Sequence, residues 1–271
     1  MPTTLAAVAQ SGFSNASSYD QHRPSYPPQA VSQLLSHLNV AGKQGAKVID
    51  LAAGTGKFTE SLARREEGYE IFAVEPHDDM RGELERKKLA NVVTIKGHAD
   101  DIPVEAGSID AVVVAQAFHW FANENSLREI HRVLRPGGVL GMIWNVDDYN
   151  APRSWTVTTE WETKVKAITL SFDDNQPRFR HDKWKAVLDN DLKLFAWPIG
   201  EGRVPFKREL TKQAIWDRYY TLSHIANLQG EELKSIKQQV FDALENDKEA
   251  TNSTGELALN GVTYFAWMEA I

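Results

Sequence analysis

V-I-D-L-A-A-G-T-G-K-F-T, residues 48–59, is the stretch of this chain that decides its fold. An apolar run ends at the acid Asp50, small residues follow at positions 52–56, and an amphipathic segment begins after them. This pattern predicts a strand, a tight turn and a helix. Such an arrangement lets a backbone approach a nucleotide-like ligand closely.

The rest of the first half repeats this alternation of strand and helix. A helix is expected over residues 29–39, and Leu127, Ile130, Val133 and Leu134 share one face of a second helix. Strands alternating with helices predict an α/β fold with a doubly wound, mostly parallel sheet. The expected strands are residues 46–51, 71–74, 92–95, 109–115 and 139–144.

Beyond Asn145 the pattern changes. Residues 147–192 are rich in Trp, Asp and Arg, and we expect them to be helical or irregular. Residues 193–210 read as extended with a bend near Pro198, and helices follow at about 212–226 and 231–247. A last strand is expected over 262–268. The second half should therefore complete a seven-stranded, Rossmann-like sheet and insert a helical lid after the fifth strand.

Composition excludes several classes of function. The chain has 271 residues, of which 42% are hydrophobic, a net charge of −7 and no cysteine. The acidic balance argues against nucleic acid or an anionic membrane as partner. Without cysteine the chain can form no disulfides, thiolate metal sites or Cys nucleophiles. No spacing of its histidines matches a metal-binding motif. We expect a cytoplasmic protein, monomeric or homodimeric.

The glycine turn has three possible ligands. A phosphate-binding loop needs Ser or Thr after Gly56-Lys57, where this chain has Phe58. A dinucleotide site needs a third glycine, where this chain has Thr59. Asp50 repels pyrophosphate but suits a cationic methionine tail, which favours S-adenosylmethionine (SAM).

Four segments resemble motifs of the class I SAM-dependent methyltransferases, in particular the small-molecule branch called methyltransferase type 11. They are V-I-D-L-A-A-G-T-G (48–56), V-E-P-H-D-D-M (74–80), G-H-A-D-D-I-P (97–103) and L-R-P-G-G-V-L (134–140). The resemblance implies that Glu75 accepts the ribose hydroxyls, Met80 packs on the adenine, and the Ala99 amide and the Asp100 carboxylate hold its edge. The other cofactor-binding residues it implies are Asp50, Ala52, Gly54, Gly56 and Pro76.

Two positions depart from the family pattern. Ala52 replaces the first glycine of the turn, and its methyl group can be accommodated if the residue keeps φ < 0, so we expect tighter packing there and a retained site. His98 stands where the family often has an acid.

Two further segments are similar to small-molecule methyltransferases of the trans-aconitate type and their fungal relatives. Y-D-Q-H-R-P-S-Y-P (19–27) resembles a segment that closes over SAM, which implies that Tyr19 and Arg23 reach the cofactor carboxylate. The alternative is an N-terminal segment made rigid by its prolines. A-Q-A-F-H-W-F (115–121) follows the fourth strand, so Gln116 and Ala117 are expected beside the methionine part of SAM.

His119 is the candidate catalytic residue, because an imidazole at that place can accept a proton from a hydroxyl, thiol or ammonium acceptor. The alternative is that His119 shapes the pocket wall, and a carboxylate or thiolate acceptor needs no base. The candidate acceptor-binding residues are Phe118, Trp120, Phe121, Trp144 and Asn145. Later candidates are Trp155, Trp161, Trp184, Trp216, Tyr219, Tyr220 and His224.

Five arginines form a separate group of candidates, because they can pair with an acidic acceptor, although scattered arginines usually lie at the surface. They are Arg153, Arg178, Arg180, Arg203 and Arg218.

The sequence thus predicts a SAM-dependent methyltransferase acting on a small molecule by in-line displacement. Alternatives are a protein that uses SAM for another reaction, an NAD-type oxidoreductase and a non-catalytic interaction module. We expect residues 1–45 to cover the cofactor and supply the first helix, 46–146 to form the SAM-binding core, 147–192 to form the substrate lid, and 193–271 to complete the sheet.

Overall fold

A seven-stranded sheet runs through the computed structural model, which describes residues 24–172, 176–189, 192–245 and 251–271. Its strand order is β3-β2-β1-β4-β5-β7-β6. β7 is antiparallel to both of its neighbours, and the other strands share one direction. The predicted doubly wound, mostly parallel sheet is confirmed. The strands are β1 (Lys47–Leu51), β2 (Glu70–Val74), β3 (Val92–Ile95), β4 (Ile109–Ala115), β5 (Leu134–Asp147), β6 (Gly200–Leu210) and β7 (Leu257–Glu269).

The strand order reverses between β1 and β4. β1 pairs with β2 on one side and with β4 on the other, so the chain winds outward in both directions from this point. In open α/β sheets a ligand binds outside the carboxyl ends of the strands where the order reverses. The turn after β1 and the segment after β4 meet at that place.

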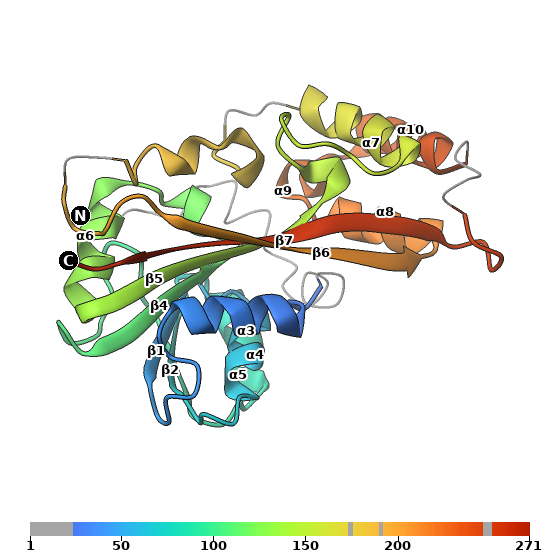
Figure 1. Cartoon of the computed structure of the whole chain (residues 1–271). Coiled ribbons are helices and arrows are strands. Elements are labelled where there is room, and N and C mark those ends of the chain that lie inside the picture. The colour runs from blue at the N-terminus through green and yellow to red at the C-terminus, as the bar shows by residue number, and fades with distance from the viewer. Residues whose placement is uncertain (1–23, 173–175, 190–191, 246–250) are drawn as a thin grey trace.

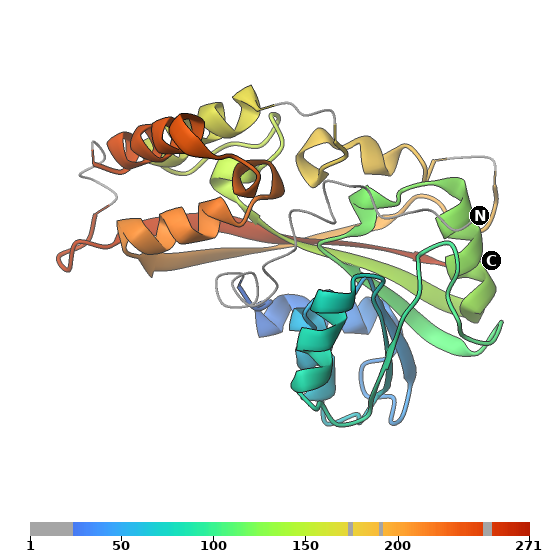
Figure 2. The same cartoon turned by 180° about the vertical axis from the view of Figure 1, so that it is seen from behind.

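Helices cover both faces of the sheet, as Figures 1 and 2 show. On one face α3 (Pro28–His37) and α4 (Lys57–Ala63) pack against Val48, Ala111 and Val113. α5 (Asp78–Arg86) lies beside α4, since Lys87 at its end pairs with Glu60. On the other face α6 (Glu124–Val133) packs against alternate strand residues. Burial on both faces explains why the central strands are continuous apolar runs.

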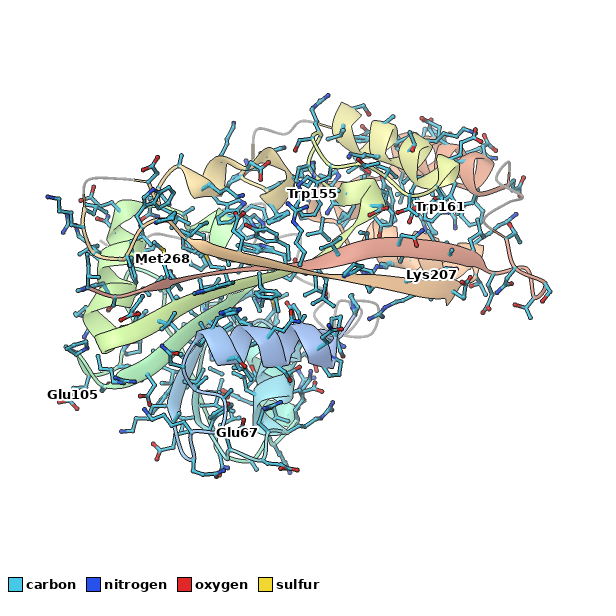
Figure 3. The ribbon with its side chains drawn as sticks, in the orientation of Figure 1. Glu67, Glu105, Trp155, Trp161, Lys207 and Met268 are labelled. Atoms are coloured by element: carbon cyan, nitrogen blue, oxygen red, sulfur yellow. The ribbon has the colours of Figure 1, made fainter. Side chains whose placement is uncertain are left out.

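A second group of helices covers the far ends of β6 and β7. α7 (Glu160–Ser171), α8 (Lys212–Tyr220) and α10 (Gly230–Glu245) share a buried cluster with Leu257 and Leu259 of β7. We call these three helices the helical cap. Trp155 and Trp161 lie on this side of the sheet and Glu67 on the other (Figure 3). The cap therefore draws on two parts of the chain, before and after β6.

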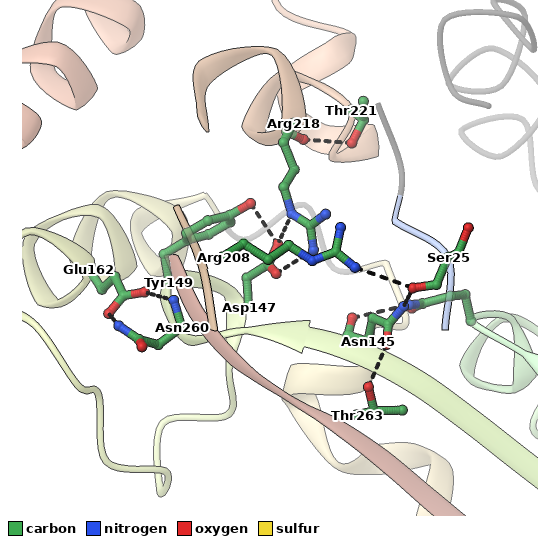
Figure 4. Close-up of polar contacts among 11 residues, drawn as sticks. Ser25, Asn145, Asp147, Tyr149, Glu162, Arg208, Arg218, Thr221, Asn260 and Thr263 are labelled. Atoms are coloured by element: carbon green, nitrogen blue, oxygen red, sulfur yellow. Dashed lines mark hydrogen bonds and ion pairs between the residues drawn. The ribbon is translucent and has the colours of Figure 1, made fainter. Parts of the chain in front are cut away.

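A buried acid joins the cap to the sheet. Glu162 forms a capping box with Thr159 at the start of α7 and accepts a hydrogen bond from the Asn260 amide of β7 (2.6 Å). Burial raises the pKa of Glu162 to about 7. The same region holds a buried ion pair between Asp147 and Arg218, joined by the Tyr149 hydroxyl (Figure 4).

Several elements differ from the predicted bounds, and three of them show the physical reason. β5 begins at Leu134, because Leu134 already pairs with Ile109 across a register shift. β7 begins at Leu257, because the strand continues beneath the cap, and Gly261 leaves room there for the Phe206 ring. The helix expected over 212–226 divides into α8 and the short α9 (Ser223–Ala226), since Leu222 has extended backbone angles.

Short 3-10 turns lie in some of the connections. They are η1 (Phe118–Trp120), η2 (Asp148–Asn150), η3 (Phe179–His181) and η4 (Lys183–Lys185). None of the helices in the described ranges is both long enough and apolar enough to cross a membrane.

Candidate functional site

The turn after β1 is left-handed at three alternate residues. Ala52 has φ +57°, Gly54 +57° and Gly56 +84°. The expectation that Ala52 keeps a negative φ is therefore wrong. The backbone path of the turn requires the left-handed conformation at position 52 whatever the residue, so the Ala52 methyl group adds strain of about 1 kcal/mol.

Gly56 is also needed for close packing, whereas a Cβ at Gly54 would make an ordinary contact. A Cβ at Gly56 would lie 2.3 Å from Leu84 Cδ1 of α5, and one at Gly54 would touch the Met80 sulfur at 3.6 Å. The Gly54 amide donates to Glu75 Oε2 (2.8 Å). The turn is thereby fixed against the end of β2 and the start of α5.

Replacing Ala52 by Gly is expected to raise the free energy of unfolding by up to about 1 kcal/mol, because glycine adopts the left-handed region without strain. Ala53, which lacks a positive φ, is the matched control. Ala53→Gly is expected to lower stability by roughly 0.5 kcal/mol, since glycine makes the unfolded chain freer. Urea unfolding measures both, and a destabilised Ala52→Gly protein would contradict the strain.

Asp50 lies in β1, just before this turn, and its side chain has no exposed surface. Its Oδ2 accepts a hydrogen bond from the Thr59 hydroxyl of α4 (2.6 Å), whereas its Oδ1 has no hydrogen-bond partner among the described residues. Burial raises the pKa of Asp50 to about 7. A buried carboxylate oxygen of this kind is costly unless a donor or cation meets it.

Glu75, at the end of β2, faces the same turn. Its Oε2 accepts from Gly54, and its Oε1 accepts from the His77 amide (2.8 Å). Burial raises the pKa of Glu75, although both amides oppose that rise. Each carboxylate oxygen retains one further lone pair for a ligand hydroxyl. Pro76 follows directly and is half-buried.

The predicted adenine-edge segment forms a tight turn beyond β3. The His98 and Asp101 backbones exchange hydrogen bonds of 3.1 Å, so Ala99 and Asp100 form the tip of the turn. Both tip residues are half-buried. Met80, the predicted adenine contact, is buried at the start of α5.

A second left-handed residue other than glycine follows β4. Gln116 has φ +63°, and its amide donates to the Ile143 carbonyl (2.8 Å). Its side-chain Nε2 donates to the Asn145 carbonyl (3.0 Å). Strain at positions 52 and 116 thus marks the ends of the two neighbouring strands where the order reverses, and such strain is often found at ligand sites. Ala117 follows and precedes η1.

Beyond this edge a polar pocket opens between β5 and the segments 176–181 and 222–224, with about 620 Å³ of open space. The sequence-predicted residues His119, Trp120, Trp144, Asn145 and Gln116 line it. Its other lining residues are Val146, Asn150, Arg178, Phe179, Arg180, Leu222, Ser223 and His224.

Several of these lining residues were not foreseen. Asn150 lies in η2, and Leu222 and Ser223 lie at the start of α9. These short elements carry no motif, so no sequence signal singles the three residues out. Arg178, Arg180 and His224 appeared only among broad groups of basic or aromatic candidates.

Phe118 and Phe121 do not line the polar pocket. Phe118 has no exposed surface and packs edge-on against Trp184, so it belongs to the core on that face. Phe121 packs edge-on against Phe118 at 5.8 Å. Trp161 and Trp184 are likewise core residues. Phe118 and Phe121 therefore pack against each other instead of lining this pocket.

His119 is held by a neighbour on β5. The Trp144 indole N–H donates to His119 Nδ1 (3.3 Å). Because an indole nitrogen only donates, Nδ1 acts as acceptor, and in a neutral imidazole the proton then lies on Nε2. This geometry favours His119 as a hydrogen-bond donor in the pocket wall over His119 as a base.

Tyr19 and Arg23 lie outside the described residues. The segment that follows them is tied to the sheet, because Asn145 Nδ2 and Arg208 Nη2 both donate to the Ser25 carbonyl at 3.4 Å (Figure 4). Asn145 also accepts from the Thr263 hydroxyl of β7 (2.7 Å). One residue of the polar pocket therefore fixes the start of the described chain.

Comparison with known proteins places this geometry in context. A family model described as a methyltransferase domain matches residues 49–142. An uncharacterized methyltransferase-like protein of Schizosaccharomyces pombe is 33% identical over 226 residues, which are 82% of this chain and 81% of that protein. An uncharacterized methyltransferase of Mycobacterium tuberculosis is 44% identical over 130 residues, which are 48% of this chain. The matched region spans 50% of the mycobacterial relative.

Solved structures share the fold at low sequence identity. A putative type II methyltransferase from Anaeromyxobacter dehalogenans has a TM-score of 0.60 and 20% identity, covering 92% of this chain and 97% of that one. A putative methyltransferase from Bacillus halodurans has a TM-score of 0.54 and 18% identity, covering 88% and 98%.

Proposed function

The chain belongs to the class I SAM-dependent methyltransferases, and from that premise we propose that it transfers the methyl group of SAM to a small-molecule acceptor. The acceptor binds in the polar pocket, and the cofactor binds along the edge formed by the turns after β1, β2, β3 and β4. The observation that carries the proposal is the buried carboxylate of Asp50.

Asp50 fits the amino-acid part of SAM. Its Oδ1 is buried and lacks a hydrogen-bond partner among the residues that the structure describes. An ammonium group would supply both the donor and the positive charge that a buried carboxylate requires. A pyrophosphate group would instead add a second negative charge, which disfavours a dinucleotide at the same turn.

The remaining cofactor contacts follow the same edge. Glu75 offers one lone pair on each oxygen to the ribose hydroxyls, in addition to the two backbone amides that it already accepts. Met80 and the turn at Ala99 and Asp100 border the adenine. Gln116 and Ala117 lie where the methionine part meets the polar pocket.

Methyl transfer depends more on the alignment of the acceptor with SAM than on proton transfer to a protein base. A lone pair of the acceptor forms a bond to the methyl carbon, while the electron pair of the breaking carbon–sulfur bond passes to sulfur. A hydroxyl or thiol acceptor also releases a proton to solvent, and an ammonium acceptor must release one before its nitrogen has a lone pair to attack with. Holding the acceptor in line at about 3 Å and excluding water lowers much of the barrier. Gln116, Trp120 and His119 are placed to do so.

His119→Ala is expected to lower kcat by less than about tenfold, since a true general base contributes about a hundredfold or more. Nitrogen NMR of labelled histidine gives a second readout that needs no acceptor. We expect the neutral His119 ring to carry its proton on Nε2, and Trp144→Phe to shift the ring toward a mixture of tautomers. A proton found on Nδ1 in the unaltered protein would restore His119 as a candidate base.

Ligand binding followed by product analysis tests the proposed function. We expect SAM and its demethylated product, S-adenosylhomocysteine, to raise the melting temperature, and NAD to leave it unchanged. Mass spectrometry of reactions with small-molecule mixtures should then detect methylated products together with S-adenosylhomocysteine. Stabilisation by NAD would favour an oxidoreductase, and SAM consumption without methylated product would favour another use of the cofactor.

A further inference from the structure

The side-chain amide of Gln116 is held in one orientation at the cofactor edge of the polar pocket. Its Nε2 donates to the Asn145 backbone carbonyl at 3.0 Å. A carbonyl oxygen only accepts hydrogen bonds, so the amide nitrogen has to face it, and a reversed amide would place two oxygens against each other. This contact therefore decides where the amide oxygen of Gln116 lies.

The residues on both sides of this contact are themselves fixed. The backbone amide of Gln116 donates to the Ile143 carbonyl (2.8 Å), which holds Gln116 at φ +63°. Asn145 lies in β5, where its side chain accepts from the Thr263 hydroxyl (2.7 Å) and donates to the Ser25 carbonyl (3.4 Å). A residue in a strained conformation persists only where its surroundings hold it. The Gln116 side chain is thus placed before a ligand binds.

Oε1 is the end of the Gln116 amide that is left for a ligand. Gln116 lines the polar pocket and is half-buried. No group in the described ranges of the chain donates to Oε1, and this oxygen is not enclosed away from solvent. An amide oxygen accepts hydrogen bonds and donates none. A ligand at this edge of the pocket therefore meets a fixed, neutral hydrogen-bond acceptor.

We infer that Gln116 Oε1 accepts a hydrogen bond from the nucleophilic group of the methyl acceptor, and that this group is an amine carrying at least one N–H. This inference rests on the proposed function, in which Gln116 lies where the methionine part of SAM meets the polar pocket. An N–H that points to Oε1 leaves the nitrogen lone pair free to face the methyl carbon. A carboxylate or thiolate offers no hydrogen, and its negative atom would face the amide oxygen unpaired.

An amine suits this site better than a hydroxyl does. A neutral amine attacks with its own lone pair, forming the carbon–nitrogen bond while the electron pair of the carbon–sulfur bond passes to sulfur. The nitrogen becomes positively charged and then releases a proton to solvent. An alcohol oxygen is a weak nucleophile until its proton is removed, and a neutral amide is too weak a base to remove it. Gln116 therefore orients the nucleophile and takes no proton.

Sinefungin tests this inference without a known acceptor. In this analogue of SAM a carbon bearing an amine replaces the sulfonium and its methyl group, so N–H groups occupy the methyl position. Calorimetric titration compares sinefungin, SAM and S-adenosylhomocysteine. We expect Gln116→Met, which keeps the length of the side chain, to weaken sinefungin binding by about tenfold or more. The affinities for the other two ligands should fall by less than about threefold.

Two further variants serve as controls. Gln116→Glu keeps an accepting oxygen at the same length, so it should retain the preference for sinefungin over SAM that Gln116→Met loses. Gln238→Met is the matched control, because Gln238 is an exposed glutamine of α10 whose Nε2 donates to Asp242. It should leave all three affinities unchanged.

The possible outcomes separate this inference from the proposed function. An equal loss of all three ligands in Gln116→Met, or unchanged binding of sinefungin, would overturn the inference. A methylated product that carries its new methyl group on oxygen or sulfur would also overturn it and leave methyl transfer standing. If the unaltered protein binds neither SAM nor S-adenosylhomocysteine, the proposed function itself fails.

Discussion

Asp50→Asn is expected to weaken the binding of SAM and S-adenosylhomocysteine by about thirtyfold or more. Removing one partner of a buried, hydrogen-bonded charge pair costs about 2 kcal/mol at least, because the other charge is left unpaired. Asparagine keeps the size of the side chain and can still accept from Thr59, so the turn should remain intact. Calorimetric titration gives both dissociation constants.

The control for this experiment is a ligand. 5′-Methylthioadenosine shares the adenine, ribose and sulfur of the cofactor but lacks the ammonium and carboxylate. Its affinity should be the same for the unaltered protein and for Asp50→Asn. An equal loss for all three ligands would mean that the substitution damages the turn, and equal affinity for SAM would remove Asp50 from the site.

The raised pKa of Asp50 adds a pH dependence with a defined sign. Burial favours the protonated form up to about pH 7, whereas the ligand ammonium needs the ionised form. Binding must therefore release a proton below pH 7. From about pH 5.5 to about pH 7.5 the affinity for SAM should rise and then level off, with a slope approaching tenfold per pH unit at the acid end. Asp50→Asn should remove this dependence.

Arg218→Gln is expected to lower the free energy of unfolding by about 3–5 kcal/mol, because it leaves the Asp147 carboxylate buried without its cationic partner. Arg218 Nε donates to Asp147 Oδ2 at 2.8 Å, and the two side chains are 7% and 9% exposed. Burial alone would lower the pKa of Arg218, but Asp147 raises it above its usual value. Urea unfolding measures the loss.

A surface pair provides the matched comparison. Arg128 and Glu124 on α6 are 54% and 55% exposed, and Arg128→Gln should cost less than about 1 kcal/mol. The double variant Asp147→Asn with Arg218→Gln should recover part of the loss, since it buries no lone charge. Equal effects of Arg128→Gln and Arg218→Gln would show that the buried pair contributes no more than an exposed one.

The core of the sheet could be predicted because its signals are local. β3 and β4 have the predicted bounds, since an apolar run flanked by polar turns defines a strand buried on both faces. The ends of β5 and β7 could not be predicted, because the residues beyond the predicted bounds pair with distant parts of the chain. Leu134 joins β5 through Ile109, and Leu257 joins β7 beneath the helical cap.

The cofactor edge could likewise be predicted from local motifs, whereas most of the polar pocket could not. Asp50, Gly54, Gly56 and Glu75 lie within short motifs, and the structure joins two of these motifs directly, because the Gly54 amide donates to the Glu75 carboxylate. The positive φ of Ala52 could not be predicted, because the backbone path of the turn decides φ whatever the side chain. Arg178 and Ser223 are 45 residues apart and meet only through tertiary packing.

β5, β6 and β7 pass without interruption from the cofactor edge to the helical cap, and this continuity has a mechanical consequence. Enzymes that open like a clamshell rotate two bodies about a few flexible residues. Here three paired strands join the core to the cap in place of such flexible residues. The β5–β7 ladder runs from the Val139–Glu269 pair to the Asp147–Gly261 pair. We expect the core and cap to turn together as one rigid body.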